Sequence, residues 1–230
     1  FAEYLRIPAA VLERGTFVVP DGISPQEACL TEPLACCINA VTDTPVKLGD
    51  TSLILGAGTM GLLMLEACKA AGAAQVLVSE PDVARRAEAQ RRGAVVADPA
   101  GVPLGEWVVD MAGHAGPDQV FVCVGTVDAA VQGIGLAGNG GSVNVFGGLA
   151  GGSMLSVDAR RIHYDEIVLT GSFGFTPDHF KTALDLLASG RVNVASLISH
   201  VFELAEAAKA FGVASSGQAF KVIMAVRPHA

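Results

Sequence analysis

The chain has 230 residues, of which 51% are hydrophobic, 17% are charged and 27 are glycine. This composition excludes a disordered chain, which would combine low hydrophobicity with high net charge, and the glycines lack the period of three found in collagen. The formal net charge is −8 and the sequence has no basic cluster, so we expect no nucleic-acid partner. The sequence also has no run of about 18 apolar residues, so we expect no membrane-spanning segment.

The segment before residue 51 contains one strong helix signal. Residues 17–20 resemble a short strand that ends in a turn. Ser24 and Glu27 have the spacing of a capping box, which predicts that a helix begins there. The apolar run from Ala28 to Val41 follows, and we expect Pro33 to interrupt it.

From residue 51 onward, short apolar strands alternate with helices. Six strands are predicted, at residues 51–55, 75–79, 94–97, 119–124, 142–146 and 167–170. Helices are predicted at residues 60–71, 83–92, 127–137 and 158–164, and the connection around 107–111 shows no clear preference. Strands without polar alternation, separated by helices, are typical of a parallel sheet covered on both faces. The sequence therefore predicts an α/β fold with a doubly wound, six-stranded parallel sheet of the Rossmann type.

The pattern changes after Phe175. Apolar residues recur with helical spacing in residues 176–189, which predicts an amphipathic helix. A second helix is predicted at 204–211 and a closing strand at 219–226. These elements do not continue the strand–helix alternation, so they indicate a second, smaller structural unit.

The sequence Gly56-Ala57-Gly58-Thr59-Met60-Gly61 joins the first predicted strand to the first predicted helix. Its G-x-G-x-x-G spacing in that context is the dinucleotide-binding fingerprint, in which the three glycines allow the turn, the approach of a pyrophosphate and close helix packing. The backbone N–H groups at the start of the helix, at Thr59 and Met60, favour a bound phosphate. The alternative is a glycine-rich turn that serves packing alone.

Glu80 follows the second strand, 19 residues beyond Gly61. A carboxylate at this position can accept hydrogen bonds from both ribose hydroxyls of NAD and would repel a 2′-phosphate, so NAD is favoured over NADP. Arg85 and Arg86 weaken that preference, because either guanidinium is able to pair with a phosphate.

The five cysteines are odd in number and form no C-x-x-C pair. This argues against a disulfide framework and against a four-cysteine zinc site, so we expect reduced thiols and a cytoplasmic location.

Six segments in fixed order carry a resemblance to a known family: Phe1-Ala2-Glu3-Tyr4, Glu32-Pro33-Leu34, Gly56 to Gly61, Val122-Cys123-Val124-Gly125, Gly140-Gly141-Ser142-Val143 and Ala183 to Val192. The chain resembles the medium-chain dehydrogenase/reductase superfamily, in particular its zinc-dependent polyol branch of sorbitol, threonine and glucose dehydrogenases. The resemblance implies a Rossmann domain at residues 39–175 and parts of a GroES-like catalytic domain at 1–38 and 176–230. Family members are longer at the N-terminus, so we expect a member cut before Phe1 that lacks most catalytic ligands.

The resemblance also implies roles for single residues. It places Glu32 at the catalytic zinc, as a ligand or as the partner of the zinc-bound water, although the residue pattern alone suits a first-turn carboxylate that stabilises a helix. It places several groups after the fourth, fifth and sixth strands around the coenzyme: Val124, Gly125, Phe146, Gly147, Gly148, Ser172 and Phe173. Gly174 stands where sorbitol dehydrogenases have an arginine, which argues against sorbitol as the substrate.

Three functions are compatible with these features. The first is a zinc-dependent dehydrogenase that transfers a hydride between a secondary alcohol or polyol and NAD, with an alcohol or ketone as its small-molecule partner. The second is a zinc-free, NADPH-dependent reductase of enones or quinones, against which Glu32 and Glu80 argue. The third is a non-catalytic NAD-binding module, since we expect little turnover from the 230 residues alone. The resemblance implies a homodimer or homotetramer that associates through the fifth and sixth strands.

Overall fold

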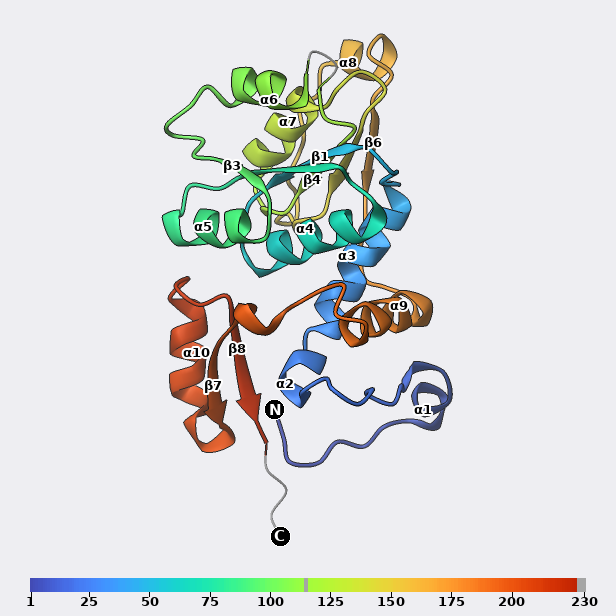
Figure 1. Cartoon of the computed structure of the whole chain (residues 1–230), viewed down its shortest axis with the longest axis vertical. Helices are drawn as coiled ribbons and strands as arrows, with labels where there is room; N and C mark the ends of the chain where they lie inside the picture. Colours follow the sequence, from blue (N-terminus) through green and yellow to red (C-terminus); the bar gives the residue numbers. More distant parts are fainter. Residues whose placement is uncertain (114–115, 227–230) are drawn as a thin grey trace. The chain divides into compact units, whose positions relative to one another are not determined.

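The computed structural model describes residues 1–113 and 116–226 and divides the chain into two compact units. The first unit comprises Phe1–Ala35 and Thr176–Ala230, and the second comprises Cys36–Phe175. The second unit contains a six-stranded sheet with the order β3-β2-β1-β4-β5-β6 (Figure 1). Its strands are β1 (Thr51–Leu55), β2 (Gln75–Ser79), β3 (Val95–Ala97), β4 (Gln119–Val122), β5 (Ser142–Val145) and β6 (Val168–Gly171). Every neighbouring pair is parallel, which confirms the predicted Rossmann sheet.

Helices cover both faces of this sheet (Figure 1). They are α4 (Thr59–Ala71), α5 (Val83–Arg91), α6 (Leu104–Ala112), α7 (Val127–Leu136) and α8 (Ala159–His163). In Figure 1, α4 and α5 lie on one side of the sheet, against β1, β2 and β3, and α6 and α7 lie on the other side. Helix α6 occupies the connection for which the sequence showed no preference, and it is held by the burial of Leu104 and Val108 one turn apart.

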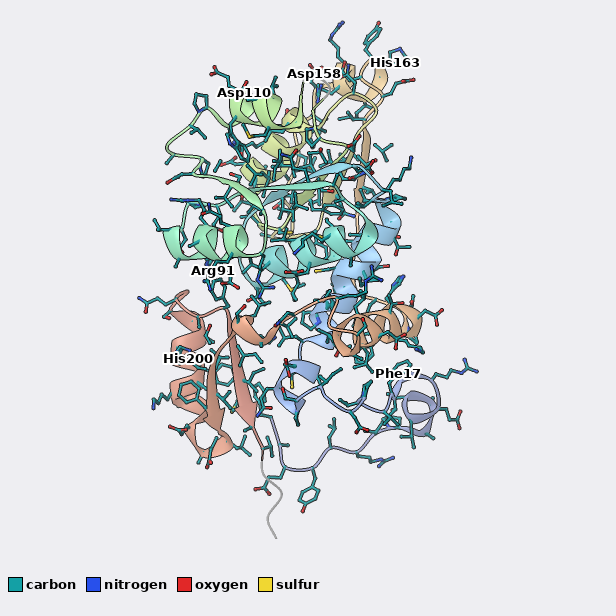
Figure 2. The ribbon with its side chains drawn as sticks, in the orientation of Figure 1. Phe17, Arg91, Asp110, Asp158, His163 and His200 are labelled. Atoms are coloured by element: carbon teal, nitrogen blue, oxygen red, sulfur yellow. The ribbon has the colours of Figure 1, made fainter. Side chains whose placement is uncertain are left out.

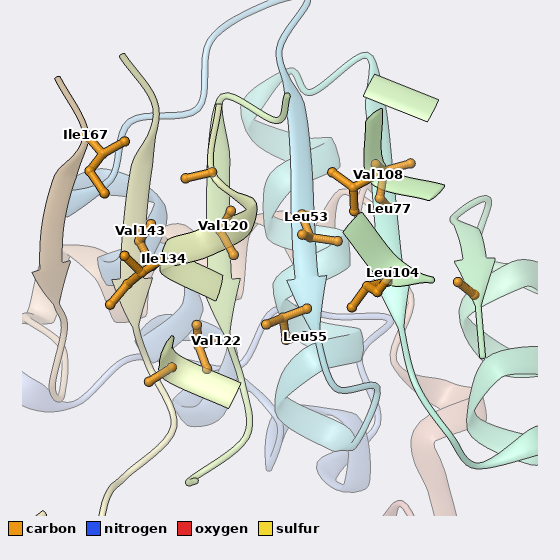
Figure 3. Close-up of a cluster of buried hydrophobic side chains, with 13 residues drawn as sticks. Leu53, Leu55, Leu77, Leu104, Val108, Val120, Val122, Ile134, Val143 and Ile167 are labelled. Atoms are coloured by element: carbon orange, nitrogen blue, oxygen red, sulfur yellow. The ribbon is translucent and has the colours of Figure 1, made fainter. Parts of the chain in front are cut away.

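The hydrophobic core on the α6 and α7 side is built from alternate strand residues. Leu53 and Leu55 of β1 pack there with Val120 and Val122 of β4, and Ile134 of α7 covers them (Figure 3). Because successive strand side chains point to opposite faces, Ile54 and Phe121, which are also fully buried, belong to the other face. Burial on both faces explains why these strands show no polar alternation.

Side-chain caps begin several helices of the second unit. Asp82 accepts a hydrogen bond from the Arg85 amide at the start of α5, and Thr126 accepts one from the Ala129 amide at the start of α7. Asp158 caps α8 in the same way, as labelled in Figure 2. These caps satisfy amide groups that have no partner inside the helix, so they fix where each helix begins.

The first unit contains the remaining elements. They are α1 (Ala9–Gly15), α2 (Pro25–Ala28), α9 (Pro177–Ala188), β7 (Ile198–Glu203), α10 (Ala207–Ser215), β8 (Lys221–Ala225) and short 3₁₀ turns at Ala195–Leu197 and Leu204–Glu206. Helix α3 (Thr31–Asp43) begins in the first unit and ends in the second. The predicted capping box is present at Ser24 and Glu27, and β7 and β8 form a parallel pair.

Two predictions for the N-terminal segment are wrong. Residues 17–20 form no strand in the described chain; the Phe17 ring instead stacks on Phe180 of α9, with ring centroids 5.5 Å apart (Figure 2). Pro33 does not interrupt its helix, because it lies in the first turn of α3, where an N–H group has no intrahelical partner anyway.

Two differences concern the C-terminal segment. The helix expected at 204–211 is a 3₁₀ turn followed by α10, and the strand β7 was not predicted because Ser199 and His200 break its apolar run. No helix within the described residues is long and apolar enough to cross a membrane.

Glu166 adopts a left-handed backbone conformation, with φ 54°, in the exposed turn between α8 and β6. A side chain in this conformation is strained by about 1 kcal/mol, whereas glycine adopts it freely. We therefore expect Glu166→Gly to leave the free energy of unfolding unchanged or to raise it by up to about 1 kcal/mol in urea denaturation. Gln90→Gly, an exposed helical control in α5, should lower it by about 0.5–1 kcal/mol. An equal loss for both variants would contradict the strain at Glu166.

Candidate functional site: the carboxyl edge of the parallel sheet

The predicted coenzyme residues of the second unit gather at the carboxyl ends of its strands. Parallel strands end at one edge of the sheet, and ligands of doubly wound folds bind outside that edge. The turn after β1 holds Gly56, Gly58, Thr59, Met60 and Gly61; Glu80 follows β2 and Arg85 lies in α5; Val124 and Gly125 follow β4; Phe146, Gly147 and Gly148 follow β5; Ser172 and Phe173 follow β6. Glu32 belongs to the first unit.

Packing within the protein requires two glycines of the fingerprint. A Cβ atom at Gly61 would lie 2.0 Å from the carbonyl oxygen of Gly56, which is impossible without moving the backbone. Gly56 has φ +96°, and a Cβ there would lie 2.5 Å from the side chain of Val124. These contacts bring α4 and the segment after β4 directly against the turn.

The segments after β4 and β5 approach each other equally closely. A Cβ atom at Gly125 would lie 2.4 Å from the carbonyl oxygen of Gly148, and one at Gly147 would lie 2.6 Å from the carbonyl carbon of Val124. The Gly147 amide donates a 2.7 Å hydrogen bond to the carbonyl of Val122 in β4. The backbones of these two segments are therefore in direct contact at the edge of the sheet.

Gly58 and Gly148 differ from these glycines, because packing in the described chain does not require them. The nearest atom to a Cβ at Gly58 is Nη1 of Arg85 at 3.8 Å, and no heavy atom of the described residues lies within 4 Å of a Cβ at Gly148. Neither residue has a positive φ. The space beside their backbones is thus open to a ligand.

The start of α4 has the properties of a phosphate site. Its N-cap residue is Gly58, and within the described chain no side chain caps this helix, in contrast to α5, α7 and α8. Its first turn contains no acidic residue. The positive end of the helix dipole therefore faces the open space beside Gly58 without a compensating carboxylate from the helix itself.

Glu80 is hydrogen-bonded to the backbone of the glycine turn. Its side chain is 4% exposed; one carboxylate oxygen accepts a 2.7 Å hydrogen bond from the Ala57 amide and the other accepts a 2.9 Å bond from the Asp82 amide. Each oxygen keeps a second lone pair for a further donor. Glu80 thus fixes the backbone between Gly56 and Gly58 and places a negative charge beside it.

The two arginines of α5 have different surroundings. Arg86 donates hydrogen bonds to the carbonyls of Glu80 and Pro81, at 2.7 and 2.6 Å, and pairs with Asp98, so it holds the ends of β2 and β3 together. Arg85 extends its guanidinium toward Gly58. Of the two side chains, Arg85 is therefore the one placed to meet a phosphate beside the glycine turn.

The thiols near the sheet are not reactive groups. Burial raises the pKa of Cys68 to about 12. Burial and the neighbouring Cys68 also raise the pKa of Cys123, which follows β4. Both therefore remain protonated near neutral pH and supply no thiolate nucleophile. None of the five cysteines, all of which lie in the described part of the chain, forms a disulfide.

Sequence reasoning missed Asn144, which is fully buried in β5. Its side-chain amide donates hydrogen bonds to the hydroxyls of Thr44 and Ser172, and Ser172 donates in turn to Asp43. The signal available in the sequence was a polar residue in the middle of the apolar strand 142–146.

The described residues do not form a zinc site by themselves. Glu32 is exposed in the first turn of α3, where its carboxylate is favourable to the helix dipole. No three His, Cys, Asp or Glu side chains in the described part of the chain come close enough to hold a metal ion. A catalytic zinc uses three protein ligands, of which Glu32 is able to supply one.

The comparisons with known proteins identify the family of this chain. Residues 59–189 match the family model described as zinc-binding dehydrogenase. Sorbitol dehydrogenase of Halalkalibacterium halodurans is 32% identical over 90% of this chain and 60% of its own length. D-arabitol-phosphate dehydrogenase of Enterococcus avium is 31% identical over 94% of this chain and 62% of its own length.

A solved structure shows the same fold. It is a protein of Sinorhizobium meliloti described as a zinc-binding dehydrogenase, bound to NADP; it has a TM-score of 0.84 and 31% identity over 90% of this chain and 61% of its own. The chain thus spans about 60% of the length of the relatives that it matches. Because the family model covers more than half of its residues, the chain belongs to the zinc-binding dehydrogenase family.

Proposed function

We propose that this chain binds NAD at the carboxyl edge of its parallel sheet and takes part in the oxidation of a secondary alcohol or polyol. The observation that carries this proposal is Gly58, whose lack of a side chain leaves open space at the uncapped start of α4 and which no contact in the described chain explains. Relatives named as sorbitol and arabitol-phosphate dehydrogenases support the reaction class. The second unit would be the dinucleotide-binding domain, and the first unit part of a catalytic domain.

Each group at the edge has a task in this proposal. The amides at the start of α4, with Arg85 beside them, bind the pyrophosphate. The backbone after β4, β5 and β6 bounds the coenzyme along the sheet edge. When bound, the coenzyme supplies a nicotinamide ring able to accept a hydride from the alcohol carbon. Glu32 would contribute to a zinc site in the whole protein, with ligands that the described residues do not provide.

The choice between the coenzymes follows from the charges beside the turn. In folds with this glycine fingerprint, the ribose of the bound dinucleotide lies beside the acidic residue after the second strand, which here is the buried Glu80. A carboxylate in that position favours ribose hydroxyls over a 2′-phosphate. Arg85 favours a phosphate, and a relative of known structure is bound to NADP. We propose NAD because Glu80 is fixed in place by two backbone amides, whereas Arg85 also suits the pyrophosphate that both coenzymes share.

The cysteines, which form no disulfide in the described structure, support a cytoplasmic protein, and strand β6 at the end of the described sheet supports self-association. We propose a homodimer or a homotetramer as the functional assembly, with an alcohol or ketone as the small-molecule partner.

Substitutions at Gly58 and Gly61 are expected to separate coenzyme binding from packing. Gly58→Ala should leave the free energy of unfolding within about 0.5 kcal/mol of the original chain and weaken NADH binding by at least about tenfold, because the added methyl group occupies the phosphate position. Gly61→Ala should lower the free energy of unfolding by about 3 kcal/mol. Urea denaturation and NADH fluorescence titration measure the two effects. Unchanged NADH affinity in Gly58→Ala would contradict the proposed site.

The proposed site implies a preference between the two coenzymes. The original chain should bind NADH at least about tenfold more tightly than NADPH, as measured by fluorescence titration, and Arg85→Ala should weaken NADH binding by about tenfold through loss of a charge-assisted hydrogen bond. Arg91→Ala, at the far end of α5, is the matched control and should bind NADH normally. Equal or tighter binding of NADPH would contradict the proposed preference for NAD.

The proposed assembly implies that the exposed edge of β6 takes part in self-association. Strand β6 pairs with β5 and forms an end of the described sheet, and Ile162, Tyr164 and Val168 expose apolar side chains near it. A dimer that joins two β6 edges should be weakened at least about tenfold by Val168→Lys, because charged residues block edge pairing. Sedimentation velocity measures this effect. A chain that stays monomeric at high concentration, or a dimer indifferent to Val168→Lys, would exclude this interface.

A further inference from the structure

Asn144 is a polar side chain between the apolar Phe121 of β4 and Thr170 of β6 in the sheet. In the strand register, Val78, Ile54, Phe121 and Asn144 lie in one row across β2, β1, β4 and β5. Asn144 is 0% exposed, as are Ile54 and Phe121. Burial of an amide is unfavourable unless the amide is hydrogen-bonded: the Nδ2 group of Asn144 has two acceptors, whereas its Oδ1 atom has no hydrogen-bond partner among the described residues.

The partners of Asn144 form a continuous chain of hydrogen bonds, which we name the polar latch: Asp43, Thr44, Asn144 and Ser172. The Asn144 Nδ2 group donates to Thr44 Oγ1 at 2.8 Å and to Ser172 Oγ at 2.9 Å. Ser172 Oγ donates to Asp43 Oδ2 at 2.7 Å. Asn144 and Ser172 donate in sequence toward the Asp43 carboxylate, so these two hydrogen bonds polarise and strengthen each other, and the bond from Asn144 to Thr44 is a branch of the chain.

The latch joins two parts of the second unit that are far apart in the sequence. Asp43 is the last residue of α3 and Thr44 follows it, whereas Ser172 opens the segment 172–175 after β6. The hydroxyl of Ser172 both accepts from Asn144 and donates to Asp43, so it is engaged by the protein. What the segment offers to a ligand is therefore its backbone and the fully exposed side chain of Phe173.

We propose that the polar latch fixes the segment 172–175 in the position from which it contacts the nicotinamide end of the coenzyme, and that Asp43 and Asn144 are positioning residues for that contact. This inference rests on the proposed function, because it places NAD at the carboxyl edge of the sheet. An anchored segment is ordered before the coenzyme arrives. Without the latch, binding has to order the segment, and the affinity falls accordingly.

Two alanine variants and their combination test the latch. Asp43→Ala and Ser172→Ala should each weaken NADH binding by about fivefold, and the double variant by no more than either alone, because one broken bond already frees the segment. Asp43→Asn keeps an acceptor oxygen and should restore binding to within about twofold. Asp165→Ala, which removes a partly exposed carboxylate paired with Arg161, is the control and should retain NADH affinity.

Hydrogen exchange of the coenzyme-free chain gives a readout that does not involve NADH. Asp43→Ala should speed exchange in segment 172–175 by about tenfold, and Asp165→Ala should not. Unchanged exchange in Asp43→Ala would overturn the latch, as would losses of NADH affinity that simply add in the double variant. An original chain that fails to bind NADH would contradict the proposed function itself. Normal NADH binding in all latch variants would contradict the latch alone.

Discussion

The contact between the start of α4 and the turn after β1 is the constraint on which the site depends. Gly61 leaves no room for a Cβ atom against the carbonyl of Gly56, and Glu80 accepts a hydrogen bond from Ala57 in the same turn. The helix is thereby held with its N-terminal amides at the carboxyl edge of the sheet. Unlike α5, α7 and α8, this helix begins without a side-chain cap, and its first amides lie where an anion is stabilised.

The neighbouring segments extend the same principle along the edge. Gly125 and Gly147 let the backbones after β4 and β5 touch, and the latch around Asn144 holds the segment after β6. At these segments the groups presented to a ligand are backbone atoms together with the exposed side chain of Phe173, while buried side chains such as Asn144 supply the restraint. We propose that this surface follows the shape of an extended dinucleotide.

The parts of the fold that depend on local sequence were predictable. The six sheet strands follow from short apolar runs, and the fingerprint between β1 and α4 follows from glycine spacing together with the predicted strand and helix on either side of it. The helix α6 was missed because its N-cap, Pro103, provides no side-chain acceptor. The strand predicted at 17–20 failed because contact with α9, about 160 residues later, determines the position of Phe17. The polar latch was beyond sequence reasoning, since Asn144 and Thr44 are 100 residues apart and Asp43 and Ser172 are 129 apart.

The central claim is that NAD lies along the carboxyl edge, with its pyrophosphate at the start of α4. Amide hydrogen exchange of the original chain with and without saturating NADH tests this claim most directly. The account predicts slower exchange at residues 56–62, and weaker protection at 125 and 147–148, with little change at the opposite edge of the sheet. Protection confined to other parts of the chain, with residues 56–62 unaffected, would contradict it.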